Sequence, residues 1–326
     1  MRDTRPILHA ARLLGALAAA SAVAGCQHPD NLPGNVNILD PAGPVAAGQR
    51  LIIINASIIM LAIILPVMVL TPLFAWWFRA SNPRAHYRPD WAFSGRIELV
   101  VWTVPLLTIL FLGGICWIGS HDLDPAKPIQ SDRRTLEVQV VSLDWKWLFI
   151  YPEQNIAAIN QLVVPVGTPI HFTLTSASVW NAFFVPRLGS MIYTMKGMTT
   201  QLHLQADEEG TFFGMSMQFS GDGYPDMGFN LRSVAGDEFD GWIRGARGTG
   251  AALDPPTYAE LIKQSLGDPP RTFGSVDADL FRRIVALEAP QGPGPGGGAA
   301  ARPEVRERGG NDHPAGGAEG EHSHAR

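Results

Sequence analysis

The chain has 326 residues, a formal net charge of −5 and an apolar fraction of 46%. Its length allows two or three domains. The negative net charge, without a basic patch interleaved with aromatic residues, argues against a nucleic-acid partner. Cys26 follows a short apolar segment near the N-terminus and Cys116 lies within a long apolar run, so no disulfide is expected between them.

Residues 1–25 have the pattern of a bacterial lipoprotein signal peptide. Basic residues come first, a short apolar core follows, and small residues lead directly into Cys26. We expect cleavage before Cys26 and lipidation of this residue. An ordinary signal peptide, or a short anchor with an incidental cysteine, is the alternative. Residues 26–49, rich in Pro, Gly and Asn, are expected to form an irregular periplasmic lead-in.

Two long apolar runs predict transmembrane helices at residues 50–79 and 98–120. The first run would form a helix of about 42 Å, which crosses a hydrocarbon core of roughly 30 Å with some tilt. Its Pro66 and Pro72 predict kinks, which membrane helices tolerate where neighbouring helices supply hydrogen-bond partners. The second run contains Pro105 and is also long enough to span the membrane.

The short loop between the two runs, residues 80–97, is rich in arginine. Together with Arg79 it holds four arginines, against Asp90 and the following Glu98. The positive-inside rule places this loop in the cytoplasm and both ends of the mature chain in the periplasm. The sequence thus predicts a multi-pass protein of the bacterial inner membrane that is also anchored by a lipid at Cys26.

After a linker at residues 121–133, apolar residues recur at every second position through residues 134–246. Gly and Pro separate these short runs, and the pattern predicts an antiparallel β-sandwich. His171 and His203 alternate with apolar neighbours, so their side chains are expected to point outward from their strands. The alternating apolar residues are Leu136, Val138 and Val140, then Ile170, Phe172 and Leu174, then Leu202 and Leu204, then Phe229 and Leu231.

Residues 247–289 are expected to form a C-terminal helical segment. Thr257 and Glu260 have the spacing of a capping box, which predicts a helix over residues 258–266. A second helix is predicted over residues 277–287. Its apolar face would consist of Leu280, Phe281, Ile284 and Leu287.

Residues 290–326 are dense in Gly, Pro and Ala and low in bulky apolar side chains. Such a composition buries too little apolar surface to offset the loss of chain entropy on folding. We expect a disordered tail here.

Residues 214–227 read GMSMQFSGDGYPDM and carry the spacing S-x3-S-x3-Y-x2-M. Its fixed points are Ser216, Ser220, Tyr224 and Met227, and Asn181 lies upstream in VWNAFFVP. This resembles the copper loop of subunit II of the haem–copper respiratory oxidases, C-x3-C-x3-H-x2-M, with a further His on a preceding strand. The resemblance also includes the W-x-W segment Trp145-Lys146-Trp147 and VVWTVP in the second span. It implies a cupredoxin-like Greek-key barrel.

In this resemblance most of the copper ligands are missing. Ser216 and Ser220 stand at the thiolate positions, Asn181 and Tyr224 at the imidazole positions, and Gln218 at a glutamate position. Only the methionine ligand, Met227, is retained. A copper pair needs soft bridging thiolates and imidazole nitrogens, whereas a serine hydroxyl is hard and stays protonated near neutral pH. Within the family, loss of these ligands marks the quinol oxidases of the cytochrome bo type.

The resemblance implies a structural and proton-entry subunit of a proton-translocating quinol oxidase, which oxidises quinol and reduces oxygen to water. This chain is then expected to bind no cofactor. The haems and copper belong to subunit I, the main partner. Subunits III and IV and membrane lipid are further partners, and quinol is bound mainly by another subunit.

Glu98, at the start of the second span, matches a glutamate near the mouth of the family's proton channel. An ionisable group at membrane depth is a functional candidate by default. The alternative is an interfacial carboxylate that faces water or pairs with Arg96.

Two other functions remain open from the sequence. One is a cytochrome c oxidase subunit II with a degenerate copper site. The other, from a different class, is a copper-delivery or assembly lipoprotein that uses thioether ligands, which suit copper(I). Methionine is also a common gap filler in packed loops. The methionines concerned are Met191, Met195, Met198, Met215, Met217 and Met227.

Overall fold

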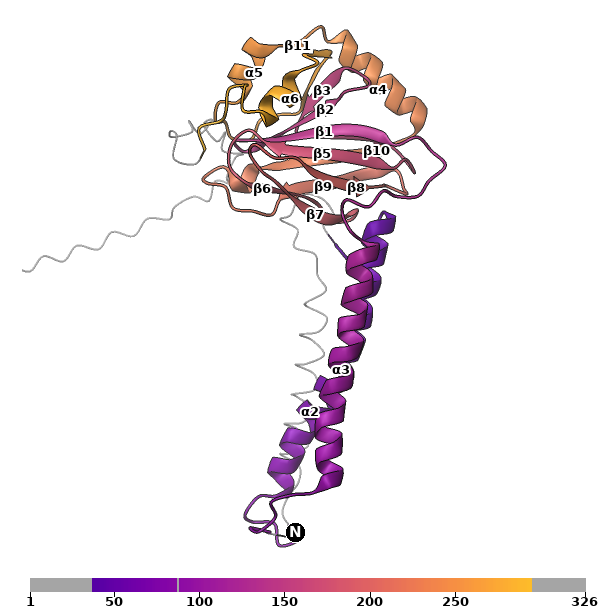
Figure 1. The fold of residues 1–326 in the computed structure, drawn as a ribbon, viewed down its shortest axis with the longest axis vertical. Helices are drawn as coiled ribbons and strands as arrows, with labels where there is room; N and C mark the ends of the chain where they lie inside the picture. Colours follow the sequence, from indigo (N-terminus) through magenta and orange to yellow (C-terminus); the bar gives the residue numbers. More distant parts are fainter. Residues whose placement is uncertain (1–36, 87, 295–326) are drawn as a thin grey trace, which may run out of the picture.

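The computed structural model describes residues 37–86 and 88–294, which form a long helical hairpin with a β-domain at one end (Figure 1). The predicted signal peptide, the lipidation site Cys26 and the tail from residue 295 onward lie outside the described residues. The predictions for these segments therefore stay predictions. The predicted start of the disordered tail at residue 290 is wrong, because Gly292 and Gly294 donate backbone hydrogen bonds to Ala177 and Asp144 of the β-domain.

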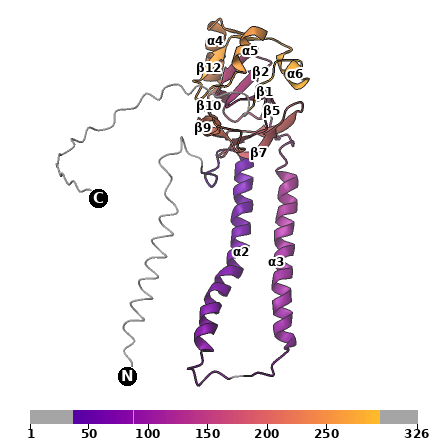
Figure 2. The same ribbon diagram turned by 90° about the vertical axis from the view of Figure 1, so that its left-hand side faces the viewer.

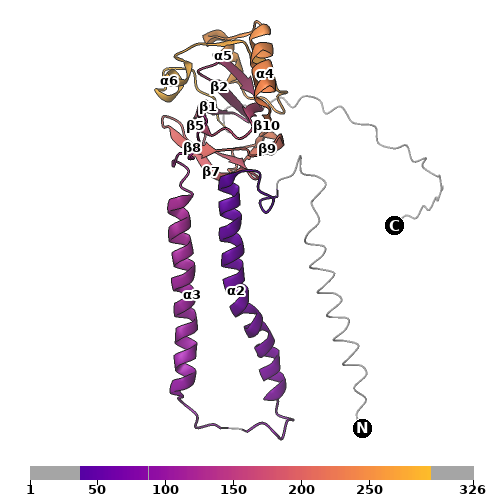
Figure 3. The ribbon, with the colours of Figure 1, turned by 90° about the vertical axis from the view of Figure 1, so that its right-hand side faces the viewer.

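The hairpin consists of α2 (Pro44–Trp77) and α3 (Gly95–Asp122), which run side by side (Figure 2). Both are long and apolar enough to cross a membrane. Helix α2 begins before the predicted residue 50, with Pro44 in the first turn where its missing N–H is not needed, and it ends at Trp77, before the predicted residue 79. Helix α3 is longer than predicted at both ends. Pro66 and Pro72 lie inside α2, and this helix bends visibly along its length (Figure 3).

The β-domain is built from two sheets. One is six-stranded with the order β12-β3-β2-β1-β5-β8, and the other is five-stranded with the order β4-β10-β9-β6-β7. We call them sheet A and sheet B. Sheet A comprises β1 (Leu136–Leu143), β2 (Lys146–Tyr151), β3 (Ile156–Ile159), β5 (Ile170–Ser176), β8 (Thr200–Leu204) and β12 (Arg271–Phe273). Sheet B comprises β4 (Gln161–Pro165), β6 (Asn181–Val185), β7 (Gly189–Thr194), β9 (Gly210–Ser216) and β10 (Gly228–Val234).

The prediction of a purely antiparallel sandwich is wrong for two strand pairs. Strand β1 pairs in parallel with β5, and β4 pairs in parallel with β10. The alternation of apolar residues shows which face of a strand is buried but carries no information about the direction of its neighbour. The parallel pairs arise because the chain crosses between the sheets, as a Greek-key barrel requires.

The inner faces of the two sheets form one core, and the alternation predicted for β1, β5, β8 and β10 is confirmed there. Aromatic rings fill its centre. Phe183 stacks on Phe229 with ring centroids 5.2 Å apart, and the ring of Trp147 meets Phe183 edge-on at 5.4 Å. Such edge and offset contacts stabilise a core beyond simple area burial. Trp147 of the W-x-W segment is therefore a packed core residue.

The C-terminal segment covers the outer face of sheet A. It follows helix α4 (Gly236–Gly248), whose buried residues join the core between the sheets. The covering segment contains β11 (Ala252–Leu253), α5 (Pro255–Leu261), β13 (Ser275–Val276) and α6 (Leu280–Val285). Its apolar residues form a second core with the outward side chains of β1, β2 and β3. Helix α4 was not predicted, because its glycines and aspartates have weak helical propensity and only Phe239, Ile243 and Ala246 are buried.

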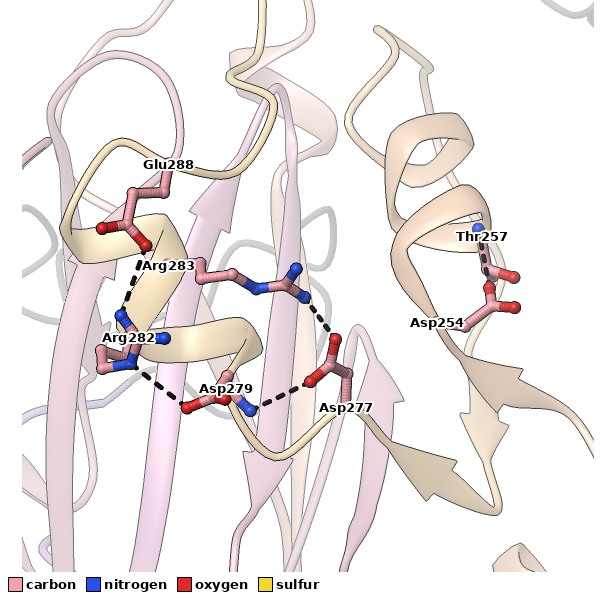
Figure 4. A network of polar contacts seen from close by, with 7 residues as sticks. All are labelled: Asp254, Thr257, Asp277, Asp279, Arg282, Arg283 and Glu288. Atoms are coloured by element: carbon pink, nitrogen blue, oxygen red, sulfur yellow. Dashed lines mark hydrogen bonds and ion pairs between the residues drawn. The ribbon is translucent and has the colours of Figure 1, made fainter.

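The predicted capping box is wrong. Helix α5 starts at Pro255, and its N-cap is Asp254, whose carboxylate accepts a 2.9 Å hydrogen bond from the Thr257 N–H (Figure 4). The side-chain and backbone hydrogen bonds from Thr257 lower the pKa of Asp254. Glu260 instead pairs with Lys263, one turn along. Pro at the first helical position, a signal for an earlier start, outweighs the Thr-x-x-Glu spacing.

Helix α6 is shorter than the predicted 277–287. Asp277, which the prediction placed inside the helix, pairs with Arg283, and Asp279 pairs with Arg282 (Figure 4). Leu280, Phe281 and Ile284 are buried as expected. Leu287 is not on this face: it is 51% exposed and has a positive φ of 62°, because the helix has already ended.

Candidate functional site

The positions of the lost copper ligands do come together, at one end of the barrel. Asn181 starts β6, Ser216 ends β9, and the loop between β9 and β10 carries Ser220 and Tyr224. Met227 closes this loop, with its carbonyl accepting a 3.3 Å hydrogen bond from the Ser216 N–H. The loop is thus folded back on itself, as the spacing of the motif predicts.

Ser216 and Asn181 bind each other. The Ser216 hydroxyl donates to Asn181 Oδ1 at 3.1 Å, and it accepts from the N–H of Ala182 at 3.3 Å. Asn181 Nδ2 donates to the carbonyl of Val179. Both side chains are almost fully buried. Buried polar groups must be paired, and here the pairing is supplied by the protein itself.

Ser220 lies opposite, and its backbone is held by a tryptophan. The indole Nε1 of Trp145 donates to the Ser220 carbonyl at 3.1 Å. Gly223 presses on the same ring: a Cβ at this position would lie 2.3 Å from Trp145 and 2.5 Å from Leu266, so only glycine fits. The Ser220 hydroxyl is buried without a hydrogen-bond partner among the described residues.

The remaining positions of the motif have different surroundings. Met227 is 1% exposed and belongs to the barrel core. Tyr224 is partly exposed and its ring meets Phe219 at 5.7 Å. Gln218, partly exposed, contributes backbone groups that hydrogen-bond the Ser216 hydroxyl. The donor set at this end of the barrel consists of two hydroxyls, an amide, a phenol and a thioether, which does not fit a dinuclear copper centre.

Asp144 and Lys146 flank Trp145, and the burial of both charged side chains, each 3% exposed, was not expected from the sequence. The Asp144 carboxylate accepts hydrogen bonds from the Ser178 hydroxyl and, at 2.9 Å, from the Gly294 N–H. Lys146 Nζ lies 2.9 Å from both the Lys263 carbonyl and Asp268 Oδ2. This three-residue clasp, Asp144 to Lys146, therefore ties the C-terminal segment to the end of the barrel that carries the loop.

Asp268, the ion-pair partner of Lys146, is only partly exposed. Burial opposes its ionisation, but the hydrogen bonds from Lys146 and Ser265 outweigh burial and lower the pKa of Asp268. Asn160 also binds the Asp268 carbonyl, at 2.9 Å. The only signal in the sequence was a pair of opposite charges around an aromatic residue, which is common on surfaces and gives no hint of burial.

Glu98 lies in the first turn of α3, at the end of the hairpin remote from the β-domain. Trp102 Nε1 donates a 3.0 Å hydrogen bond to Glu98 Oε2, one helical turn along. Among the described residues no ion pair joins Glu98 to Arg96. The ion pair between Glu98 and Arg96 that the alternative requires is therefore not formed. The Trp102 indole is the group that orients the Glu98 carboxylate.

His171 and His203 point outward from sheet A, as predicted. Their rings stack with centroids 4.5 Å apart and an interplanar angle of 8°. His171 Nδ1 binds Glu137 at 2.7 Å, and His203 contacts the Pro125 carbonyl of the linker. Burial lowers the pKa of His203, and the adjacent His171 adds to this effect. No group of three metal-ligating side chains occurs among the described residues.

The outer face of sheet B is apolar and bare along β6, β7 and β9 within the described residues, whereas β10 carries Asn230 and Arg232 on this side. Phe183 and Phe212 point into the core, so their neighbours Phe184 and Phe213 point outward. The outward positions of β6, β7 and β9 include no charged side chain. Edge strand β7 abuts the start of α2, where the Ala46 N–H donates to the Leu188 carbonyl at 3.1 Å. The outward residues are Phe184, Met191, Tyr193, Phe213, Met215 and Met217.

Comparison with known proteins identifies both parts of the β-domain. Residues 134–234 match the family model "Cytochrome C oxidase subunit II, periplasmic domain", and residues 247–287 match "COX Aromatic Rich Motif". Ubiquinol oxidase subunit 2 of Acetobacter aceti is 47% identical over 84% of this chain and 87% of its own length. Cytochrome bo(3) ubiquinol oxidase subunit 2 of Pseudomonas aeruginosa is 45% identical over 82% of this chain and 79% of its own.

Among solved structures, the periplasmic domain of subunit II of cytochrome oxidase of Bradyrhizobium japonicum is 24% identical, with a TM-score of 0.36, over 38% of this chain and 99% of that one. The barrel topology and the family match agree on a cupredoxin-like domain behind two apolar helices. The sequence identity to these oxidase subunits extends over both matched regions of the β-domain. The chain belongs to the subunit 2 family of the haem–copper quinol oxidases, as a component of a multi-subunit, membrane-bound oxidoreductase.

Proposed function

We propose that this chain is a subunit of a proton-translocating quinol:oxygen oxidoreductase and holds no dinuclear copper centre itself. The observation that carries the proposal is the pairing of Ser216 with Asn181 at 3.1 Å. Where bridging thiolates and imidazoles are required, the chain supplies neutral, hard donors that already bind one another. The haems and the copper then belong to subunit I, which receives electrons from quinol within the membrane. The similar subunits are named for ubiquinol, and we infer the same donor here.

The test is to restore the ligands in the full-length chain. The variant carries Asn181→His, Ser216→Cys, Gln218→Glu, Ser220→Cys and Tyr224→His, with Met227 already present. The folded loop should preorganise both thiolates, so copper binds without refolding the domain. We expect intense thiolate-to-copper absorption and a delocalised two-copper electron-spin signal in this variant alone.

The matched control is Ser216→Cys with Ser220→Cys, which supplies thiolates without imidazoles and should lack the delocalised signal. Tight stoichiometric copper binding by the unmodified chain would refute the absence of a copper centre. A folded, colourless five-fold variant would instead refute the assignment of the loop positions.

Glu98 is the proposed proton-entry group. Its carboxylate lies at the start of a membrane span, where an ionisable group is costly and generally functional, and its orientation is set by Trp102 at 3.0 Å. Glu98→Ala should slow oxygen reduction by the intact complex far more than Glu98→Asp, because a shorter carboxylate still relays protons. Asp90→Ala, in the same loop, is the control and should leave turnover unchanged. Near-native turnover of both Glu98 variants in a fully assembled complex would refute the role.

Subunit I is the proposed occupant of the bare face of sheet B. This face adjoins α2 through β7, so a membrane-embedded partner that packs along α2 would meet it directly. Its aromatic and methionine side chains are the types enriched in interfaces. Subunits III and IV complete the proposed complex.

The proposed placement is the bacterial inner membrane, with the hairpin loop in the cytoplasm and both termini in the periplasm. The arginines of the loop support this orientation, and so would a lipid on Cys26. Intact-mass measurement of the purified subunit should show cleavage before Cys26 and added acyl chains. An unmodified Cys26 would remove the lipid anchor but leave the two spans.

A further inference from the structure

The loop end of the helical hairpin contains a cavity of about 630 Å³ between the C-terminal end of α2 and the residues that follow it. This is the end remote from the β-domain (Figure 2). Arg79, His86 and Arg88 line the cavity together with Asn82, Phe78 and Trp91. Among the described residues that line it, none is acidic. The cavity therefore offers cationic and apolar groups side by side and no carboxylate to neutralise them.

Arg79 is fixed in place with donors to spare. Its Nε donates to the Ser81 hydroxyl at 3.1 Å and its Nη1 to the Trp76 carbonyl at 3.0 Å, while its guanidinium lies 5.1 Å from the Trp76 ring centroid. A guanidinium has five N–H groups, so three remain for a ligand. Such a preorganised fork suits the oxygens of a phosphate.

The loop that forms the walls is held by Asn82. Its Nδ2 donates to the Trp77 carbonyl at 2.6 Å, which caps the exposed end of α2, and its Oδ1 accepts from the Arg84 N–H at 3.2 Å. These bonds turn the chain back and bring Arg88 to the same side as Arg79. Arg88 and His86 form no ion pair within the described ranges 37–86 and 88–294.

We propose that this cavity binds the phosphate of an anionic phospholipid. The cationic groups directly follow Trp77, the last residue of a helix that can span a membrane, and so lie at the depth of the headgroups. Basic pockets at this depth attract anionic lipid. Phe78 and Trp91, 61% and 55% exposed, supply an apolar wall for the glycerol and upper acyl carbons, which a free phosphate would not need. The proposal depends on the membrane spans and not on the quinol oxidase function.

Arg88→Gln and Arg84→Gln form a matched pair for the test. Each removes one positive charge from the same loop, but Arg84 does not line the cavity. The intact purified complex is depleted of lipid and titrated with phosphatidylglycerol or phosphatidylcholine, and bound lipid is counted by native mass spectrometry. A salt concentration of about 1 M limits attraction between exposed charges to about 3 Å, so direct contacts dominate.

We expect one phosphatidylglycerol bound in preference to phosphatidylcholine, about fivefold weaker binding in Arg88→Gln, and no change in Arg84→Gln. Equal weakening in both variants would overturn the site, because it would show diffuse attraction to the loop. Unchanged binding in Arg88→Gln, or no preference between the two lipids, would also overturn it. Displacement of the lipid by excess inorganic phosphate would refute the phospholipid as ligand and leave a site for a free anion. Haem content and subunit composition confirm that each variant complex is assembled.

Discussion

The two sheets of the barrel differ in what covers their outer faces. In sheet A the outward apolar side chains of β1, β2 and β3 are buried under the chain's own C-terminal segment, whereas in sheet B the outward apolar side chains of β6, β7 and β9 are left open beside α2 within the described residues. Burial of an apolar face by its own chain stabilises the fold, while an apolar face left open is typical of a docking surface. Outward apolar residues thus stabilise the fold in sheet A, whereas in sheet B they offer a surface for assembly.

Ile284→Ala tests the covered face and should have the largest effect. Ile284 is fully buried between α6 and sheet A, so truncation leaves a cavity and should lower the free energy of unfolding by about 3 to 4 kcal/mol. The measurement is denaturant unfolding of the full-length chain in detergent. Val285→Ala, on the same helix and only partly buried, is the control and should cost much less.

Lys146→Met tests the clasp that holds the same cover. Loss of the ammonium group leaves Asp268 without its buried partner and should lower the free energy of unfolding by about 2 to 3 kcal/mol, a value reduced because Asp268 is 22% exposed. Adding Asp268→Leu should restore part of this loss, since it removes the unpaired charge. A double variant as unstable as Lys146→Met alone would contradict the ion-pair explanation.

His203 makes the contact between sheet A and the linker sensitive to pH. Burial lowers the pKa of His203, with the stacked His171 adding to this and the Pro125 carbonyl and Glu137 opposing it. The folded state therefore binds a proton less readily than the unfolded state. The resulting stability is complete above the ordinary pKa of about 6.5 and is lost as the pH falls from there through the folded-state pKa.

Unfolding of the full-length chain measured at pH 8 and pH 5 should show this loss, and His203→Gln should reduce the difference. An unchanged pH dependence in His203→Gln would assign the loss to other groups.

Met191→Gln with Met217→Gln tests the bare face and should change stability least. Both side chains are exposed, 40% and 49%, so the free energy of unfolding should stay within about 0.5 kcal/mol. Retention of the haem-bearing subunit during purification should nevertheless fall, because the variant places polar groups in the interface. Full retention of the haem-bearing subunit would contradict the proposal that the bare face of sheet B is an interface.

The sequence alone determined the features that depend on neighbouring residues. Length and hydropathy identified both membrane helices, and alternation identified the buried face of β1, β5, β8 and β10. The spacing of Ser216, Ser220, Tyr224 and Met227 pointed to the family that the comparisons confirmed for the chain. These signals are local, because a helix or strand repeats its buried positions at a fixed period.

Only the tertiary structure decided what depends on contacts between distant residues. The parallel partners of β1 and β4, the burial of Lys146 against Asp268, and the pairing of Ser216 with Asn181 all join segments far apart in sequence. Helix α4 forms because it packs on the barrel. A single sequence specifies such contacts only through the whole fold, since each residue's neighbours are set by how the sheets and their cover come together.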